Sequence, residues 1–289
     1  MKDFYEQVPK TRLVRRMPVA IRIDGKAFHT FTRGFQKPFD EVLVRSMQKT
    51  ARYLCENIQG CVLGYTQSDE ITLILVDYKK LTSSAWFDYE VQKMCSIAAS
   101  MATMAFNKIF AQEVLSYQRE WETSLTPQSC EIQYAHQKHL EALMVAVDRG
   151  AMFDARCFNI PKEEVCNLIY WRQLDATRNS IQMVGQANFS HKELQNKSCN
   201  QIQDMLMMQK GINWNDYPAY LKRGTCLIKS NTTTTFSTVD DNGTVVTGSA
   251  ERPHWIIDND IPIFKGEDRK YIDKLILLEN TESEIAYVN

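Results

Sequence analysis

The stretch that decides the fold is residues 18–29, PVAIRIDGKAFH. Residues 19–23 within it predict a strand, because the apolar run is interrupted only by Arg22. The strand leads directly into Asp24-Gly25, so a carboxylate stands at its end. The order of the remaining elements determines which residues meet this acid.

A second acidic cluster lies in a turn between two further strands. Two apolar runs, 61–66 and 71–76, are joined by residues 67–70, QSDE. A short polar connection between two apolar runs is typical of a β-hairpin. Asp69 therefore stands at the end of a hairpin.

The order of the predicted elements is β-α-β-β-α-β. They are strands at 19–23, 61–66, 71–76 and 152–159, helices at 41–57 and 89–113, and a helical segment at 162–185. Asp40 is the predicted N-cap of the first helix. This order indicates an α+β fold of the ferredoxin-like or polymerase-palm type, an antiparallel sheet with helices on one face. The first strand of such a sheet lies beside the central hairpin, so Asp24 and Asp69, 45 residues apart, are expected to converge.

The chain divides into a predicted palm-like catalytic domain at 1–185 and a C-terminal extension at 186–289 packed on it. The extension is first helical in pattern, then rich in β-formers, with a predicted hairpin turn at 240–243, DDNG. Residues 114–149 have no readable role and form an insert in the first domain. The insert contains His136 and His139, whose spacing suits metal ligation, but no third ligand is apparent and a surface helix is the favoured interpretation.

The composition is that of an ordinary globular enzyme. The 289 residues carry 34 Lys+Arg against 35 Asp+Glu, a net charge of −1, so RNA binding requires a local basic patch. The eight cysteines show no CxxC spacing, which favours reduced, buried thiols over disulfides or zinc. The N-terminus lacks the apolar core of a signal peptide, and no uninterrupted apolar run approaches the ~20 residues that span a bilayer. We therefore expect a cytoplasmic protein without a membrane partner.

Two carboxylates at adjacent strand ends suit Mg²⁺, a hard cation that shares its coordination shell with substrate phosphates. Paired ions activate an attacking hydroxyl and stabilise leaving pyrophosphate in nucleotidyl transfer. Gly25 permits close approach of the backbone to an ion or a triphosphate. Lys26, His29 and Lys37 are near enough in sequence to contact phosphate oxygens, and the Ser68 hydroxyl is a further donor. Each acidic motif alone is also an ordinary turn; their joint placement is what favours a site.

Several motifs spread over nearly the whole chain resemble those of the tRNA-His guanylyltransferase family and its bacterial and archaeal Thg1-like relatives. The matching runs are 22–29 (RIDGKAFH), 37–40 (KPFD), 65–70 (YTQSDE), 153–156 (FDAR), 170–173 (YWRQ), 222–224 (KRG), 255–258 (WIID) and 261–264 (IPIF). The resemblance implies a polymerase that adds nucleotides to the 5′ end of tRNA in the 3′-to-5′ direction. In that family a 5′-monophosphate is first activated, usually with ATP, or a 5′-triphosphate is used directly, and the 3′-hydroxyl of the incoming nucleotide attacks.

The resemblance also implies roles for the matching positions. Two Mg²⁺ ions would be held by Asp24, the Gly25 carbonyl and Asp69, with Glu70 supporting the metal cluster. Lys37 would help to hold the activating nucleotide. The triphosphate site would be lined by Lys26, Ala27, Phe28, His29 and Ser68. The implied partners are tRNA and the substrates ATP and GTP, and the implied assembly is a homotetramer.

One departure from the family pattern bears on the substrate. After the Trp-Arg-Gln motif, the eukaryotic guanylyltransferases carry a His-Ile-Asn-Asn-type run, where this chain has Thr177-Arg178-Asn179-Ser180. Only the first asparagine is matched. The departure favours the Thg1-like branch, which repairs truncated 5′ ends of tRNA using the opposite strand as template. Addition of G at position −1 of tRNA-His stays open as the alternative.

Two other functions share the same order of elements. A palm-fold nucleotide cyclase would act without RNA, but the Gly-Gly-Asp/Glu-type hairpin of such cyclases is absent at 67–70. A non-catalytic RNA-binding module would stack bases on aromatic residues of its central strands. Residues 64–66 and 156–158 are poor candidates for that platform.

Overall fold

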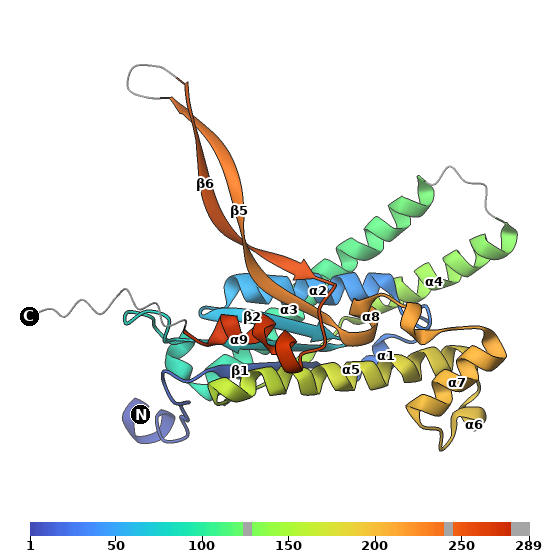
Figure 1. Ribbon diagram of the computed structural model, residues 1–289, viewed down its shortest axis with the longest axis horizontal. Coiled ribbons are helices and arrows are strands. Elements are labelled where there is room, and N and C mark those ends of the chain that lie inside the picture. Colours follow the sequence, from blue (N-terminus) through green and yellow to red (C-terminus); the bar gives the residue numbers. More distant parts are fainter. Residues whose placement is uncertain (124–128, 240–244, 279–289) are drawn as a thin grey trace, which may run out of the picture.

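The computed structural model describes residues 1–123, 129–239 and 245–278. It contains a six-stranded antiparallel sheet in the order β4-β1-β3-β2-β5-β6 (Figure 1). The strands are β1 (Val19–Gly25), β2 (Cys61–Gln67), β3 (Glu70–Leu75), β4 (Phe153–Asn159), β5 (Thr225–Val239) and β6 (Val245–Asp258). The order β4-β1-β3-β2 is that of a ferredoxin-like sheet, which confirms the predicted palm-like fold.

The helices are α1 (Phe28–Phe31), α2 (Glu41–Asn57), α3 (Val91–Glu122), α4 (Cys130–Arg149), α5 (Val165–Asn188), α6 (His191–Leu194), α7 (Cys199–Lys210), α8 (Ala219–Arg223) and α9 (Lys270–Ile276). α2 and α5 fall close to their predicted places, α3 extends beyond its predicted end, and α1, α8 and α9 were not predicted. α2 has the predicted bounds, and its start is fixed by Asp40, whose carboxylate accepts a hydrogen bond from the Leu43 N–H at 3.1 Å.

Alternate side chains of β1 point to opposite faces of the sheet. Ile21 and Ile23 are buried in the core formed with α2 and α3, whereas Ala20 is buried in a second core with side chains of α5 and α9. α2 and α3 thus cover one face, as predicted, and α5 and α9 cover the other (Figure 1). Arg22 and Asp24 share the α5 side with Ala20, which brings their charges under α5.

The predicted insert is a helical hairpin. α3 continues to Glu122 and α4 returns antiparallel to it, so that the pair extends beyond the sheet (Figure 1). The sequence predicted an end near residue 113, because the following turns lose their apolar periodicity outside the core. Gln, Glu and Arg residues there are nevertheless good helix formers, and the helix persists.

α3 is the one helix in the described ranges that is long and apolar enough to cross a membrane by length and composition. A long core helix meets the same criteria. α3 packs on the sheet through a row of buried side chains, among them Met94, Ala98 and Phe106.

The C-terminal extension adds β5 and β6 to the edge of the sheet and then projects as a long two-stranded hairpin (Figure 1). The turn predicted at 240–243 lies outside the described residues. The predicted domain boundary between 185 and 186 falls inside α5 and stays a prediction.

Candidate active site

Three carboxylates form a row across the sheet at the end of β1. Asp24 lies opposite Glu70 on β3 and opposite Asp154 on β4. Just beyond this row, the Gly25 N–H donates a hydrogen bond to the Asp69 carbonyl at 3.1 Å and fastens the strand end to the hairpin turn. The structure therefore brings Asp24 and Asp69 together, as the predicted topology required.

The hairpin turn is tighter than predicted. Gln67 pairs with Glu70, so only Ser68 and Asp69 lie between the strands. Ser68 has a left-handed φ of 49°, and its hydroxyl donates to Asp69 Oδ1 at 3.0 Å. Because the turn has only two residues, Asp69 faces Gly25 and Glu70 lies inside β3.

The carboxylates of Asp24 and Asp69 are held in an environment that disfavours their charge. Burial is the main cause of the raised pKa of both, and neighbouring carboxylates raise it further. For Asp69, hydrogen bonds from its own backbone N–H and from the Ser68 hydroxyl oppose this rise of the pKa in part. For Asp24 the nearby guanidinium groups of Arg156 and Arg22 oppose this rise only in part. Within the described part of the chain, the Asp24 carboxylate has no hydrogen-bond or ion-pair partner. Within the described ranges neither Asp24 nor Asp69 has an ion-pair partner, and in that sense the two acids are uncompensated.

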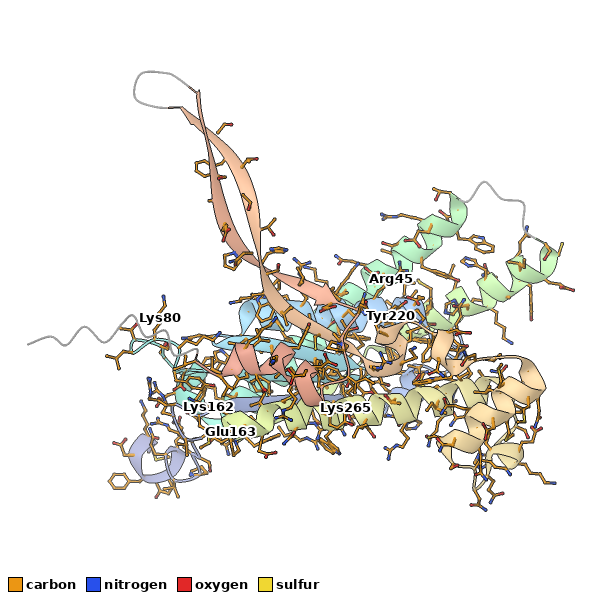
Figure 2. All side chains as sticks on the ribbon, in the orientation of Figure 1. Arg45, Lys80, Lys162, Glu163, Tyr220 and Lys265 are labelled. Atoms are coloured by element: carbon orange, nitrogen blue, oxygen red, sulfur yellow. The ribbon has the colours of Figure 1, made fainter. Side chains whose placement is uncertain are left out.

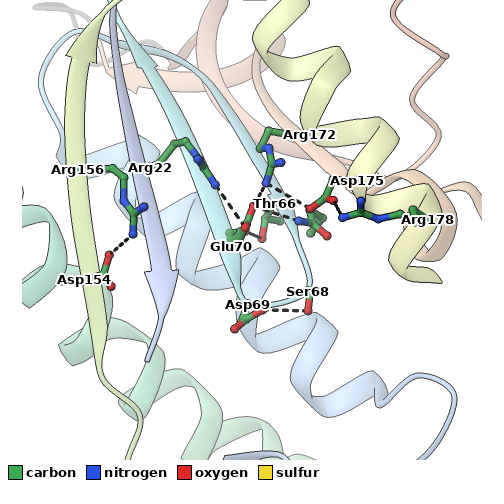
Figure 3. A network of polar contacts seen from close by, with 11 residues as sticks. Arg22, Thr66, Ser68, Asp69, Glu70, Asp154, Arg156, Arg172, Asp175 and Arg178 are labelled. Carbon is green, nitrogen blue, oxygen red and sulfur yellow. Dashed lines mark hydrogen bonds and ion pairs between the residues drawn. The ribbon is translucent and has the colours of Figure 1, made fainter. Parts of the chain in front are cut away.

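Glu70, in the same row, is fully paired (Figure 3). Its carboxylate accepts from Arg172 Nη1 at 2.7 Å, from Gln67 Nε2 at 3.1 Å and from Arg22 Nη2 at 3.4 Å. Both guanidinium groups also lie over the ring of Trp171, that of Arg172 at 3.7 Å and that of Arg22 at 5.3 Å from its centre. One signal of this cluster is present in the sequence, since Arg22 is the only charged residue in the predicted strand 19–23. The α5 partners were not foreseen.

A cavity of about 720 Å³ opens beside the Gly25–Asp69 contact. Seven of the predicted site residues line it: Gly25, Ala27, Phe28, His29, Lys37, Ser68 and Asp69. Asp24, Lys26 and Glu70 are not among its described lining residues. Sequence reasoning missed the rest of the wall, which consists of the loop from Thr32 to Gln36, of Pro38, Asp40 and Leu43, and of Met183 and Gln186 on α5.

The cavity floor is built mainly from backbone. Phe28 is buried with Phe31 and Phe153, so its ring belongs to the core. A Cβ added at Gly25 would lie 2.3 Å from that ring, which explains why a glycine stands here. Ala27 adopts a left-handed φ of 55° as the chain turns into α1.

The donor set fits a hard divalent cation. No group of three or more His, Cys, Asp and Glu side chains suited to metal binding exists in the described ranges. Two uncompensated carboxylates beside an open cavity nevertheless match Mg²⁺, which takes few protein ligands and completes its shell with water and phosphate oxygens. His136 and His139 form no such group; they are buried against α3, so the surface interpretation of this part of α4 was wrong for these two side chains.

Comparisons with known proteins agree on one family. A family model described as tRNAHis guanylyltransferase matches residues 1–161. An uncharacterized protein of Acanthamoeba polyphaga mimivirus is 30% identical over 221 residues, covering 72% of this chain and 69% of that protein. The tRNA(His) guanylyltransferase of Saccharomyces cerevisiae is 25% identical over 225 residues, covering 73% of this chain and 82% of the enzyme.

Solved structures extend the likeness to almost the full length. A bacterial Thg1-like protein in complex with ATP superposes with a TM-score of 0.72 at 36% identity, covering 96% of this chain and 97% of the other. The yeast enzyme, at 22% identity and a TM-score of 0.57, shares the fold over 77% of this chain and 90% of its own. The chain therefore belongs to the Thg1 family, tRNAHis guanylyltransferase, and is a nucleotidyltransferase.

Proposed function

We propose that this nucleotidyltransferase adds nucleotides to the 5′ end of tRNA in the 3′-to-5′ direction, using the opposite strand as template to repair truncated ends. The observation that carries the proposal is the contact between Gly25 and Asp69. It joins the end of β1, which carries Asp24, to Asp69, which lines a cavity of about 720 Å³.

ATP and GTP are the proposed nucleotide substrates. The bacterial Thg1-like protein has been solved in complex with ATP at 36% identity and with GTP at 35% identity to this chain. Here the exposed side chains of His29 and Lys37 line the cavity, and Lys37 supplies a positive charge for phosphate oxygens. The Ser68 hydroxyl lies at the same wall.

Two Mg²⁺ ions are the proposed cofactors. Asp24, Asp69 and the Gly25 carbonyl would hold them, since the two carboxylates lack cationic partners of their own. When bound, such ions lower the pKa of the attacking hydroxyl and neutralise charge on the leaving pyrophosphate. Glu70 would act indirectly, by holding the start of β3 and hence the Ser68-Asp69 turn in place through Arg172.

The run at 177–180 supports repair over tRNA-His-specific addition. In this chain Arg178 forms an ion pair with Asp175, and the Ser180 hydroxyl accepts a hydrogen bond from Trp214 Nε1 at 3.0 Å. Two residues of the run thus serve contacts within the protein. The higher identity to the bacterial Thg1-like structure than to the yeast guanylyltransferase points the same way.

A panel of tRNAs lacking one or more 5′ nucleotides, incubated with each labelled nucleoside triphosphate, tests the proposal. We expect Mg²⁺-dependent incorporation of the nucleotide that pairs with the opposite strand. Addition of a single G to intact tRNA-His alone would instead identify a guanylyltransferase. A cyclic product without RNA would identify a cyclase, and metal-independent RNA binding without turnover would leave only an RNA-binding module. A tetrameric assembly and a cytoplasmic location stay predictions, the first testable by light scattering.

A further inference from the structure

α4, in the segment 114–149 that has no readable role in the sequence, lies along the loop that walls the cavity. The loop 30–40 contacts α4 at three positions along the helix. Arg149 Nη1 donates to the Thr30 carbonyl at 2.7 Å. A Cβ added at Gly34, whose φ is +90°, would lie 2.9 Å from Ala142 Cβ, so backbone and helix are in close contact there. The third contact is a hydrogen bond between His139 and Asp40.

Asp40 is the residue that closes this loop. Its Oδ2 accepts from the Gln36 N–H at 3.0 Å, and its Oδ1 accepts from the Leu43 N–H at the start of α2. His139 Nε2 lies 2.7 Å from the same Oδ2. Asp40 and His139 are each 5% exposed. Lys37 stands between the two ends of the closed loop, so its position depends on Asp40.

A chain of hydrogen bonds continues from His139 into the helical hairpin. The Tyr117 hydroxyl on α3 lies 3.0 Å from Nδ1 of His139 and 3.0 Å from Nδ1 of His136. The ring of Trp121 stacks on His136 at 3.8 Å. Burial is the main cause of the lowered pKa of His136 and of the raised pKa of Tyr117.

One arrangement of protons is consistent with all three hydrogen bonds. His136 Nδ1–H donates to the Tyr117 oxygen, the Tyr117 hydroxyl donates to His139 Nδ1, and His139 Nε2–H donates to Asp40. The Nε2–H donor is a third hydrogen-bond partner of the Asp40 carboxylate. The carboxylate then keeps its two backbone N–H partners, which hold the loop.

The helical hairpin is firmly attached to the sheet side of the molecule. Arg45 of α2, labelled in Figure 2, forms ion pairs with two residues of α3, Glu113 at 3.5 Å and Glu120 at 3.6 Å. Lys49 of α2 also pairs with Glu113. The hairpin is therefore a fixed support for the loop it contacts.

We propose that His139 is a positioning residue for nucleotide binding: acting through Asp40, it holds the loop 36–40 and thereby Lys37 in the wall of the cavity. The identity of the bound nucleotide rests on the proposed function, whereas the support of the loop by α4 rests on the contacts described above. Through these contacts the segment 114–149 forms part of the site.

The test compares His139→Leu with His139→Gln. Gln can donate to Asp40 through its amide nitrogen and accept from Tyr117 through its oxygen, whereas Leu keeps the volume and loses both bonds. We expect His139→Leu to weaken binding of a non-hydrolysable nucleoside triphosphate about tenfold and to raise KM with little change in kcat. Hydrogen exchange in residues 36–40 should accelerate. His139→Gln should stay close to wild type in all three measurements.

Two further variants separate positioning from general support of the fold. His136→Leu disturbs the same buried cluster without touching Asp40 and should weaken nucleotide binding less than His139→Leu. Tyr117→Phe keeps the aromatic packing, removes the acceptor from His136 and the donor to His139, and provides a milder test if His139→Leu fails to fold. The inference is wrong if folded His139→Leu binds nucleotide as wild type does, or if His136→Leu has the same effect on binding.

The result that contradicts the proposed function can be distinguished from the result that contradicts the role of His139. If wild-type protein adds no nucleotide to any tRNA, the proposed function is wrong, while exchange in residues 36–40 still tests the role of His139 without substrate. If wild type is active and exchange in the loop is unaltered by His139→Leu, only the positioning role is wrong.

Discussion

Asp69 and Glu70 are neighbours in the sequence, yet their carboxylates lie in opposite environments. Asp69 lies in the hairpin turn at the cavity, where burial and nearby acids raise its pKa. Glu70 lies one residue further, inside β3, and accepts hydrogen bonds from Arg22, Arg172 and Gln67. Figure 3 shows the two carboxylates pointing to different surroundings.

This difference assigns separate roles to two acids that are adjacent in the sequence motif. An acid with three hydrogen-bond donors has no need of a metal ion, and its removal takes from the buried Arg172 the shorter of its two carboxylate contacts. An acid with raised pKa and no cationic partner gains most from an added cation. We infer that Asp69 serves chemistry and Glu70 serves the geometry of the turn.

The largest expected effect is a loss of catalysis when one of the two uncompensated acids, Asp24 or Asp69, is replaced. Asp69→Asn should lower nucleotide incorporation on the order of a thousandfold, because metal ions supply several kcal/mol of charge stabilisation in such transfers. Asp24→Asn should do the same. The matched control is Asp154→Asn, since Asp154 lies in the same row but is paired with Arg156 at 3.0 Å and its side chain is 60% exposed. Single-turnover incorporation measures the effect, and equal losses in Asp69→Asn and Asp154→Asn would remove the distinction.

Glu70→Gln should act first on stability. The side chain of Arg172 is 5% exposed and would keep only Asp175, at 3.4 Å, as a carboxylate partner. We expect the free energy of unfolding to fall by about 2 kcal/mol, with a smaller loss of activity than in Asp69→Asn. Urea denaturation measures the change.

A double-mutant cycle provides the control for that loss. Adding Arg172→Gln to Glu70→Gln should cost less than the sum of the two single changes, since the partners form one network. Strict additivity would show that the pair contributes nothing as a pair.

The third expected effect is an increase in stability. The folded protein holds the protons of Asp24 and Asp69 more tightly than the unfolded chain does, because their pKa values are raised by burial and by neighbouring acids. Ionisation above the folded-state pKa therefore costs stability, and this cost disappears as the pH falls toward the ordinary Asp value of about 3.9. Asp24→Asn and Asp69→Asn should raise the melting temperature at pH 7 without divalent cations, and the gain should shrink at lower pH.

Addition of Mg²⁺ provides the matching control. Mg²⁺ should stabilise the wild type and have a weaker effect on both variants, because a ligand stabilises only the state that binds it. A lower melting temperature for either Asn variant at pH 7 would show that the carboxylate is compensated in the folded protein.

The order of elements was predictable because it rests on local signals. Apolar runs placed the four strands of the palm, the Asp40 cap and apolar spacing placed α2, and the known topology of such sheets then brought Asp24 beside Asp69. The turn length was wrong because Gln67 and Glu70, both polar, continue the ladder of hydrogen bonds.

Contacts between distant segments could not be read from the sequence. Arg172 and Trp171 lie about one hundred residues beyond Glu70, and their meeting depends on how α5 crosses the sheet. The His139 to Asp40 bond likewise joins residues 99 positions apart and depends on how α4 packs against the loop that precedes α2. Such pairs are set by tertiary packing, which propensity does not encode.

The smallest expected effect belongs to Trp171. Its side chain contributes a ring under two guanidinium groups while remaining 51% exposed, so it stabilises the Glu70 cluster chiefly by cation–π contact. Trp171→Ala should lower the free energy of unfolding by about 1 kcal/mol, less than Glu70→Gln, and Trp171→Phe should retain part of that stabilisation because a smaller aromatic face remains. Thermal denaturation of both variants measures the difference. A loss of nucleotide incorporation as large as that of Asp69→Asn, at unchanged stability, would place Trp171 with the catalytic acids and break the division between the two regions.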